Sequence, residues 1–373
     1  MLTSQSVRHL IEAVDPKTNV LSVYLDINSA TGLWKQKVYA FEKELERLDA
    51  ALETPIQRRQ FAAEQQKVLA FVRDFKSHGK SLVIFSSAPQ QLWWTTTLHV
   101  DCPQSVHYGA GPEVGPLEAL LDEHQPYGVG LVDHAHARLF TVQMGEIGEQ
   151  RGIKSRVPAH HKRTGFKSRL QHRHDEKEQL HLRRVITGLK ALHRDTGIRR
   201  LVLGGAVEPI ALLQAQLPKE LNSIVVGTFR APLYASNSQV LGEAAQVEAL
   251  FEAQKESRTI EELLTRGSRH GSAVLGADET LLALYRGEAF ELVVAAGYHQ
   301  KGCACPKCGF AATTLERACP LCSSRTERSA DVVELAIKKA ALAGVRVEVV
   351  TGPARERLVA TGSMGALLKP KSR

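Results

Sequence analysis

The chain has 373 residues, of which 43% are hydrophobic and 24% are charged, and its formal net charge is +8. This composition indicates a globular protein with buried cores and excludes a largely disordered chain. The sequence has no uninterrupted apolar run of about 18 residues and no apolar core near its first residue. We therefore expect a cytoplasmic protein with no membrane span. At roughly 100–150 residues per domain, the length allows two or three domains.

Residues 1–125 are predicted to form a first α/β domain. The expected strands are 20–26, 81–86 and 91–100, and the expected helices cover 34–48 and a stretch that follows Pro55. Trp93 and Trp94 alternate on the third strand, so we expect one in the core and the other exposed, where it can stack on a base. The run Gly109–Gly115 lacks the spacing of a dinucleotide or phosphate-binding loop and is expected to be a plain loop.

Residues 126–266 are predicted to form a second α/β domain, which begins at Pro126-Tyr127-Gly128. Strands and helices alternate in it, so its sheet is expected to be partly parallel. The expected elements are a hairpin of strands 129–133 and 137–143, a helix around 182–192, a strand 200–203, a helix 209–217, a strand 224–228 and a connecting helix 239–266.

The second domain contains a stretch, residues 151–174, that we call the basic segment. It holds eight Lys or Arg residues and four His residues but no Asp or Glu. A solvated helix face usually mixes both charges, so an acid-free stretch favours nucleic-acid phosphates as its partner. Thr164 and Gly165 lie among the cations and indicate a flexible loop tip. The predicted RNA-binding residues are His160, His161, Lys162, Arg163, Thr164, Gly165, Phe166, Lys167, Ser168, Arg169, Gln171 and Arg173.

Residues 267–373 are predicted to form a third α/β domain with an inserted zinc knuckle. Its expected elements are a helix 278–285, a strand 290–295, a helix 332–343 and a strand 345–350. The cysteine pairs Cys305/Cys308 and Cys319/Cys322 lie between the first strand and the second helix. Each pair has CxxC spacing, and two such turns that face each other form a four-thiolate site.

We interpret the four cysteines as ligands of a structural zinc ion, because no companion general base is evident. Redox dithiols are the alternative, and the twin spacing argues against them. Cys303 is either a substitute ligand or a free thiol. Cys102 is expected to be a small core residue.

The order of these motifs resembles the archaeo-eukaryotic release factor 1 and Pelota family, in its bacterial branch. In the second domain, 128–133 with 137–140 and 145–147 is similar to the strand pair that opens that family's middle domain. In the third domain, 275–281, the cysteine knuckle and 347–351 are similar to the family's last domain. The resemblance covers roughly two thirds of the chain and implies three separate α/β domains.

The family's release factors end the middle-domain loop in Gly-Gly-Gln, whose glutamine helps water attack peptidyl-tRNA. This chain has Thr164-Gly165-Phe166-Lys167-Ser168 there, with no glutamine before Gln171. The family's stop-codon-reading motifs, Asn-Ile-Lys-Ser and Tyr-x-Cys-x-x-x-Phe, are also absent from the first domain. We therefore expect neither codon reading nor hydrolysis, and we predict no catalytic residue.

A chain of this kind resembles the Balon group of bacterial ribosome hibernation factors. The resemblance implies a monomer in the ribosomal A site, with its first domain facing the decoding centre in 16S rRNA and its basic segment near the peptidyl transferase centre in 23S rRNA. It also implies elongation factor Tu as a candidate partner. Two alternatives remain: a peptidyl-tRNA hydrolase in which amides near Gly165 or the Gln171 side chain orient the water, and an RNA-binding protein that acts without the ribosome.

Overall fold

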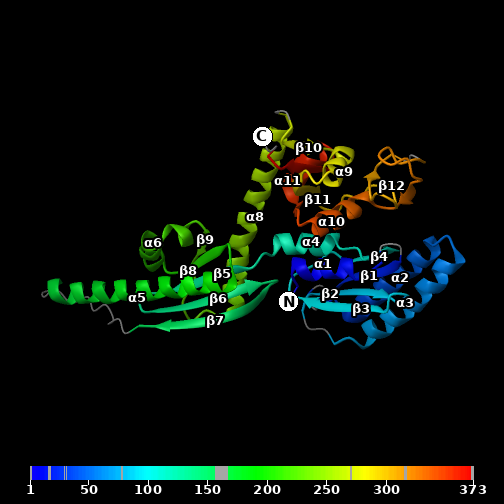
Figure 1. The fold of residues 1–373 in the computed structure, drawn as a ribbon. Helices are drawn as coiled ribbons and strands as arrows, with labels where there is room; N and C mark the ends of the chain where they lie inside the picture. The colour runs from blue at the N-terminus through cyan, green and yellow to red at the C-terminus, as the bar shows by residue number, and fades with distance from the viewer. Residues whose placement is uncertain are drawn as a thin grey trace. The chain divides into compact units, whose positions relative to one another are not determined.

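The computed structural model describes residues 2–15, 18–28, 30, 32–76, 79–155, 167–268, 271–314 and 317–370 (Figure 1). The chain forms two compact units: Met1–Glu123 together with Lys255–Arg373, and His124–Gln254. Each of the four β-sheets lies within one of the three predicted domains, and the mixed α/β class is confirmed. The three-domain division stays a prediction. No helix of the described residues is long and apolar enough to cross a membrane.

The first sheet is fully antiparallel and has the strand order β3-β2-β1-β4. Its strands are β1 (Asn19–Asp26), β2 (Ser81–Ser87), β3 (Leu92–Leu98) and β4 (Ser105–Ala110). The helices α2 (Trp34–Ala51) and α3 (Pro55–Asp74) pack Phe41, Leu45 and Phe61 into its core. The predicted strands and helices of this region are confirmed. β4 was not predicted.

Neither tryptophan of β3 is fully buried or exposed, which corrects the expected alternation. Trp93 packs edge-on against Phe71 with ring centroids 5.3 Å apart, and the Lys67 ammonium lies 4.4 Å from its centroid. Trp94 packs against Phe85 at 5.4 Å. Both rings are half-buried because each face of β3 has aromatic neighbours of its own.

Two unpredicted helices belong to the first region. α1 (Ser4–Glu12) begins after Thr3, whose hydroxyl accepts the Ser6 amide. α4 (Gly115–Glu123) buries Leu117 and Leu120. The expected loop Gly109–Gly115 is therefore too long, because Gly109 lies in β4 and Gly115 begins α4.

The sheet of the second unit has the order β7-β6-β5-β8-β9. Its strands are β5 (Tyr127–Val132), β6 (His136–Gln143), β7 (Glu146–Lys154), β8 (Leu201–Gly205) and β9 (Val225–Phe229). β5, β6 and β7 pair antiparallel, whereas β8 and β9 continue from β5 in parallel, so the partly parallel sheet is confirmed.

Helices cover both faces of this sheet. α5 (Lys167–Thr196) and α6 (Val207–Gln216) pack on one face, and Val240 and Ala244 of α8 (Asn237–Ser268) pack on the other. The short α7 (Lys219–Asn222) precedes β9. Gly205 ends β8 with φ +144, and a Cβ there would collide with the Val132 carbonyl, so only glycine fits this strand end.

The last region forms a sheet of order β10-β16-β11-β15. Its strands are β10 (Ala273–Leu275), β11 (Ala289–Ala295), β15 (Arg346–Val350) and β16 (Met364–Leu368), and its helices are α9 (Ala277–Tyr285), α10 (Val332–Ala343) and α11 (Gly352–Val359). β12 (Gly302–Ala304), β13 (Ala311–Ala312) and β14 (Glu327–Ser329) form a separate small sheet between β11 and α10. The predicted insertion is therefore confirmed.

The first and last regions of the chain pack together through side chains that bond helix ends. Arg8 donates two hydrogen bonds to the Ala341 carbonyl near the end of α10. Glu334 of α10 accepts the Val114 and Gly115 amides at 2.6 and 3.0 Å, at the start of α4. A carboxylate at a helix start satisfies amides that have no partner within the helix.

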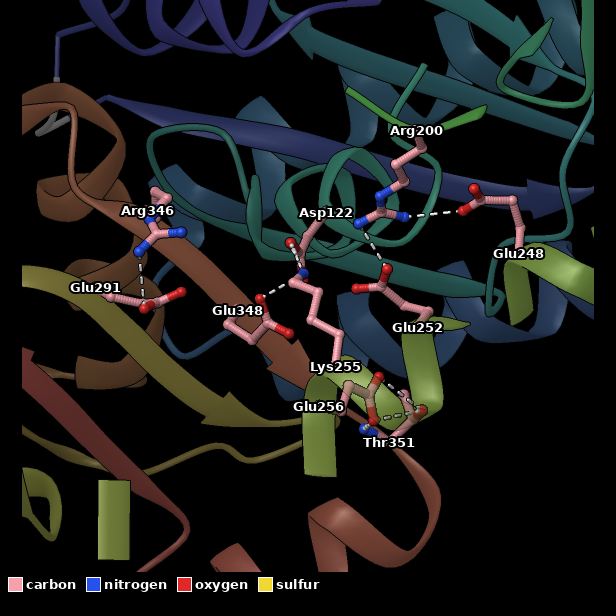
Figure 2. Close-up of polar contacts among 10 residues, drawn as sticks. All are labelled: Asp122, Arg200, Glu248, Glu252, Lys255, Glu256, Glu291, Arg346, Glu348 and Thr351. Atoms are coloured by element: carbon pink, nitrogen blue, oxygen red, sulfur yellow. Dashed lines mark hydrogen bonds and ion pairs between the residues drawn. The ribbon is translucent and has the colours of Figure 1, made fainter. Parts of the chain in front are cut away.

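The second half of α8 joins the same unit through ion pairs, which Figure 2 shows. Lys255 lies 3.1 Å from Asp122 and 2.7 Å from Glu348. The Glu256 carboxylate accepts the Thr351 amide at 3.0 Å, directly before α11. Residues distant in sequence are therefore held together by polar contacts as well as by the apolar core.

Candidate nucleic-acid interface and metal centre

The predicted RNA-binding residues fall into two groups. His160, His161, Lys162, Arg163, Thr164, Gly165 and Phe166 lie outside the described residues. Lys167, Ser168, Arg169, Gln171 and Arg173 lie in the first two turns of α5. The basic segment includes the end of β7, which runs to Lys154, and the start of α5 at Lys167.

The β5–β6 turn fixes the point at which the chain leaves β7. Asp133 accepts the amides of Ala135 and His136 at 2.7 and 2.6 Å, so its side chain stabilises the turn. The Ser155 amide then donates to the Ala135 carbonyl at 2.8 Å. Ser155, the first residue after β7, is thus hydrogen-bonded to the β5–β6 turn, which the Asp133 side chain stabilises.

His181 of α5 lies beside the same point. Its ring is buried, and its Nδ1 lies 2.9 Å from the Ser155 hydroxyl, which also lies 3.4 Å from the Arg184 guanidinium. Burial lowers the pKa of His181 from its ordinary value of 6.5, so the ring is neutral at neutral pH. His181 is therefore a structural tie between α5 and the end of β7, with no sign of acid–base work.

The second half of α5 packs on the sheet. Leu182, Val185 and Leu189 are fully buried in the core. Gly188 allows close packing, because a Cβ there would lie 2.8 Å from the side chains of both Ile153 and Leu139. The 30-residue helix is about 45 Å long, and Figure 1 shows its first half extending past the sheet. The first turns of α5, which carry Lys167 and Arg169, therefore lie beyond the sheet.

Not every cation of the basic segment is available to a ligand. Arg151 lies in β7 and pairs with Asp195 at 3.0 Å. Arg151 and then Arg194 hold the pKa of Asp195 below its ordinary value. Arg151 therefore serves the fold, and the candidate interface starts beyond it.

The second unit also contains a buried ionic cluster that the sequence did not predict. Arg200 is 5% exposed and contacts Glu248 at 2.9 Å and Glu252 at 2.7 Å (Figure 2). Its guanidinium also lies 5.1 Å from the centre of the Phe251 ring. The i, i+4 spacing of the two glutamates was the available signal. These contacts of the buried guanidinium join α8 to the start of β8.

The four predicted metal ligands come together in the small inserted sheet. All four sulfur atoms of Cys305, Cys308, Cys319 and Cys322 lie within 4.8 Å of one another. The distances are 3.5 Å from Cys305 to Cys322 and 3.6 Å from Cys308 to Cys319. Zn–S bonds of about 2.3 Å in a tetrahedron separate the sulfur atoms by roughly 3.8 Å, so the residues fit a bound metal ion.

Two backbone turns of the same design create this arrangement. The Gly309 amide donates to the Cys305 carbonyl, and the Ser323 amide donates to the Cys319 carbonyl, each at 2.8 Å. Gly309 and Ser323 both have positive φ, +73 and +57, which lets each turn close one residue after its second cysteine. Hydrogen bonds from Ser324 lower the pKa of Cys322 to about 6, which favours its thiolate.

The remaining cysteines lie outside the cluster. The buried Cys303 donates its S–H to the Thr314 carbonyl at 3.0 Å, so it is a free thiol and no substitute ligand. Burial raises the pKa of Cys102 to about 12, and its side chain is 6% exposed. The burial of Cys102 confirms the predicted small core residue.

Comparison with known proteins gives a family match that covers most of the second unit and the twelve residues before it. Residues 112–249 match bacterial archaeo-eukaryotic release factor family 10. No curated protein sequence matches the chain.

Solved structures align along nearly the whole chain at low identity. The archaeal translation termination factor aRF1 shares 13% identity, with 99% of this chain and 98% of that chain covered and a TM-score of 0.28. Archaeoglobus fulgidus Pelota shares 12%, with 98% and 92% covered and a TM-score of 0.37. Archaeal Pelota in a model with the ribosome and ABCE1 shares 12%, with 100% and 95% covered and a TM-score of 0.44. The family match covers less than half of the chain, so it shows that residues 112–249 are similar to bacterial archaeo-eukaryotic release factor family 10.

Proposed function

We propose that this chain is a translation factor that occupies the A site of idle or stalled ribosomes and neither reads codons nor hydrolyses peptidyl-tRNA. One observation carries the proposal. Residues 164–168 lie within the stretch that matches the release-factor family and contain one glycine and no glutamine. The resemblance to release factors implies that Gly-Gly-Gln would stand at this place. A factor that keeps the family's body but lacks its hydrolytic side chain acts by occupancy, as in ribosome hibernation.

The basic segment supplies the affinity for the ribosome in this proposal. Lys162, Arg163, Lys167 and Arg169 contact rRNA phosphates, and their binding releases counterions from the RNA. β7 and α5 hold the two ends of the segment, so less conformational entropy is lost when it binds. The first region faces the decoding centre, and elongation factor Tu accompanies the factor.

Co-sedimentation with vacant 70S ribosomes tests this function. We expect one protein per ribosome, displacement by A-site tRNA and an affinity that falls steeply with salt. The variant Lys162→Gln, Arg163→Gln, Lys167→Gln, Arg169→Gln should lower the salt slope by roughly three units. A control with the same charge loss at exposed positions carries Lys190→Gln, Lys219→Gln, Arg286→Gln and Arg357→Gln. Equal effects of the two variants, or no ribosome binding, would disprove the proposal.

A rescue hydrolase is the competing function, and Gln171 is the residue that favours it. Gln171 is the first glutamine after Gly165 and lies in the second turn of α5. A single-turnover assay with peptidyl-tRNA on ribosomes separates the two functions. We expect no peptide release at saturating protein. Peptide release by the unsubstituted chain that is lost in Gln171→Ala would show that the chain acts as a hydrolase.

We further propose that the four-cysteine cluster binds structural zinc. The sulfur geometry fits a tetrahedral ion, and all four protein ligands are thiolates, which leaves no open position for a substrate. Metal analysis of the purified chain should find one zinc ion per molecule. Co-purification with elongation factor Tu, with and without ribosomes, tests the partner separately.

A further inference from the structure

The small sheet that holds the cysteine cluster also forms a hollow of about 1080 Å³ on its surface. The hollow is lined by polar and charged side chains together with Cys303 and Pro306, and four of its lining residues are charged. Its charged and polar lining consists mainly of arginine. The lining residues used below are Pro306, Arg317, Arg325, Glu327 and Arg328.

The backbone of the sheet brings the three arginines together. Ala318 pairs with Arg325 across the second cysteine turn, and the Thr326 amide donates to the Arg317 carbonyl at 3.2 Å. Arg328 lies in β14 opposite Cys303 of β12. All three positions are fixed by strand pairing around the metal ligands, so bound zinc would hold them in place.

The three side chains are exposed, and within the described part of the chain none forms an ion pair. By contrast, Arg200 and Arg346 of this protein are paired with glutamates. Among the described residues that line the hollow, three arginines and the carboxylate of Glu327 leave an excess of two positive charges. Guanidinium groups form two parallel hydrogen bonds with phosphate oxygens, a geometry that lysine cannot supply.

We propose that this arginine-lined hollow binds backbone phosphates of RNA. It is a second RNA contact, on a different compact unit from the basic segment. The proposal rests on the proposed function only in taking ribosomal RNA as the natural ligand, because the binding of free RNA can be measured without ribosomes. The metal then has a purpose beyond stability, since it fixes the arginines that hold the RNA.

The test uses the full chain with the four basic-segment substitutions, so that the contribution of the basic segment is reduced. A fluorescently labelled RNA hairpin is titrated across a salt series, with the bound fraction read by anisotropy. Adding Arg317→Gln, Arg325→Gln and Arg328→Gln should weaken binding at least tenfold at low salt and lower the salt slope by roughly two units. Replacing the same residues by lysine should keep most of the slope but lose part of the affinity.

A matched control carries Arg47→Gln, Arg59→Gln and Arg286→Gln, which are exposed and outside the hollow. The metal content of every variant must equal that of the parent. An unchanged slope, or an equal loss in the control, would overturn the proposal. Binding of polyglutamate as tight as that of RNA would instead assign the hollow to an acidic protein. Ribosome co-sedimentation of the unsubstituted chain tests the proposed function, and hairpin binding tests the hollow, so failure of one does not imply failure of the other.

Discussion

Among single residues, Glu118 of α4 has a carboxyl group in an unusual environment. The residue is 8% exposed, and its Oε1 has no hydrogen-bond partner among the described residues. Burial first, and then Asp122, raise the pKa of Glu118 to about 7 from an ordinary value of 4.5, although Arg8 opposes the shift. The folded protein therefore binds more protons than the unfolded chain between these two pH values.

This difference predicts that Glu118 makes the protein less stable as the pH rises from about 4.5 to 7. Glu118→Gln should remove that loss and raise the stability at pH 8, by at most about 3 kcal/mol. Thermal melts of both proteins between pH 5 and 8 measure the effect. Glu123→Gln, an exposed position on the same helix, is the control. Parallel stability curves for wild type and Glu118→Gln would show that Glu118 is charged in the folded state.

The cysteine cluster allows a second prediction for single residues. Cys308→Ser should abolish metal binding and expose the backbone of the small sheet to hydrogen exchange, because three of the four buried hydrophobic residues described in 302–329 are cysteines. Cys303→Ser should keep the metal, since Cys303 bonds the Thr314 carbonyl and lies outside the cluster. Metal analysis with peptide-resolved hydrogen exchange distinguishes the two variants. Loss of metal in both would make Cys303 a ligand.

Among the elements, α5 packs closely on the sheet at Gly188. Gly188→Val would force a side chain against Ile153 and Leu139 and should cost about 1–3 kcal/mol. Gly242 lies in α8, and a Cβ added there would have no atom within 4 Å, so Gly242→Ala should stabilise the protein by up to about 1 kcal/mol. Chemical denaturation measures both. Equal effects of the two substitutions would mean that helix propensity alone decides, without packing against β6 and β7.

Elements with strong local patterns were predictable. β1 and β2 are continuous buried runs, and α10 has an apolar face, an Asp331 cap and a closing Gly344. β7 was missed because its sequence, EIGEQRGIK, carries charges and two glycines, and it is a strand only through pairing with β6. α4 was missed although Pro116, Leu117 and Leu120 marked its start and its buried face.

The same division applies to the candidate sites. The metal ligands were predictable because four cysteines in two short turns carry the whole site. The arginine hollow was not, because Arg317, Arg325 and Arg328 come together only when the strands pair. Likewise, Glu334 bonds the Val114 amide from 220 residues away in sequence, and no local pattern specifies such a contact.

For the whole molecule, the net charge is +8. The positions of the cations decide which of them can bind a partner. Many cations are occupied internally, as Arg151, Arg200 and Lys255 show. The two clusters proposed to bind RNA, the basic segment and the arginine hollow, belong to different compact units. Two contacts on one chain strengthen binding by more than either alone when a single large partner engages both, because the second contact forms within an existing complex.

This reasoning predicts how the two sets of substitutions combine. On vacant ribosomes, the losses in salt slope from the basic-segment variant and the arginine-hollow variant should add, to roughly five units, because each phosphate contact releases its own counterions. On a short RNA hairpin that can reach only one site, the tighter site should dominate, and the losses should not add. Sedimentation and anisotropy, each over the same salt series, measure the two cases. Additive losses on ribosomes alone would indicate that one ribosome engages both units at once, whereas non-additive losses on ribosomes would restrict RNA contact to one unit at a time.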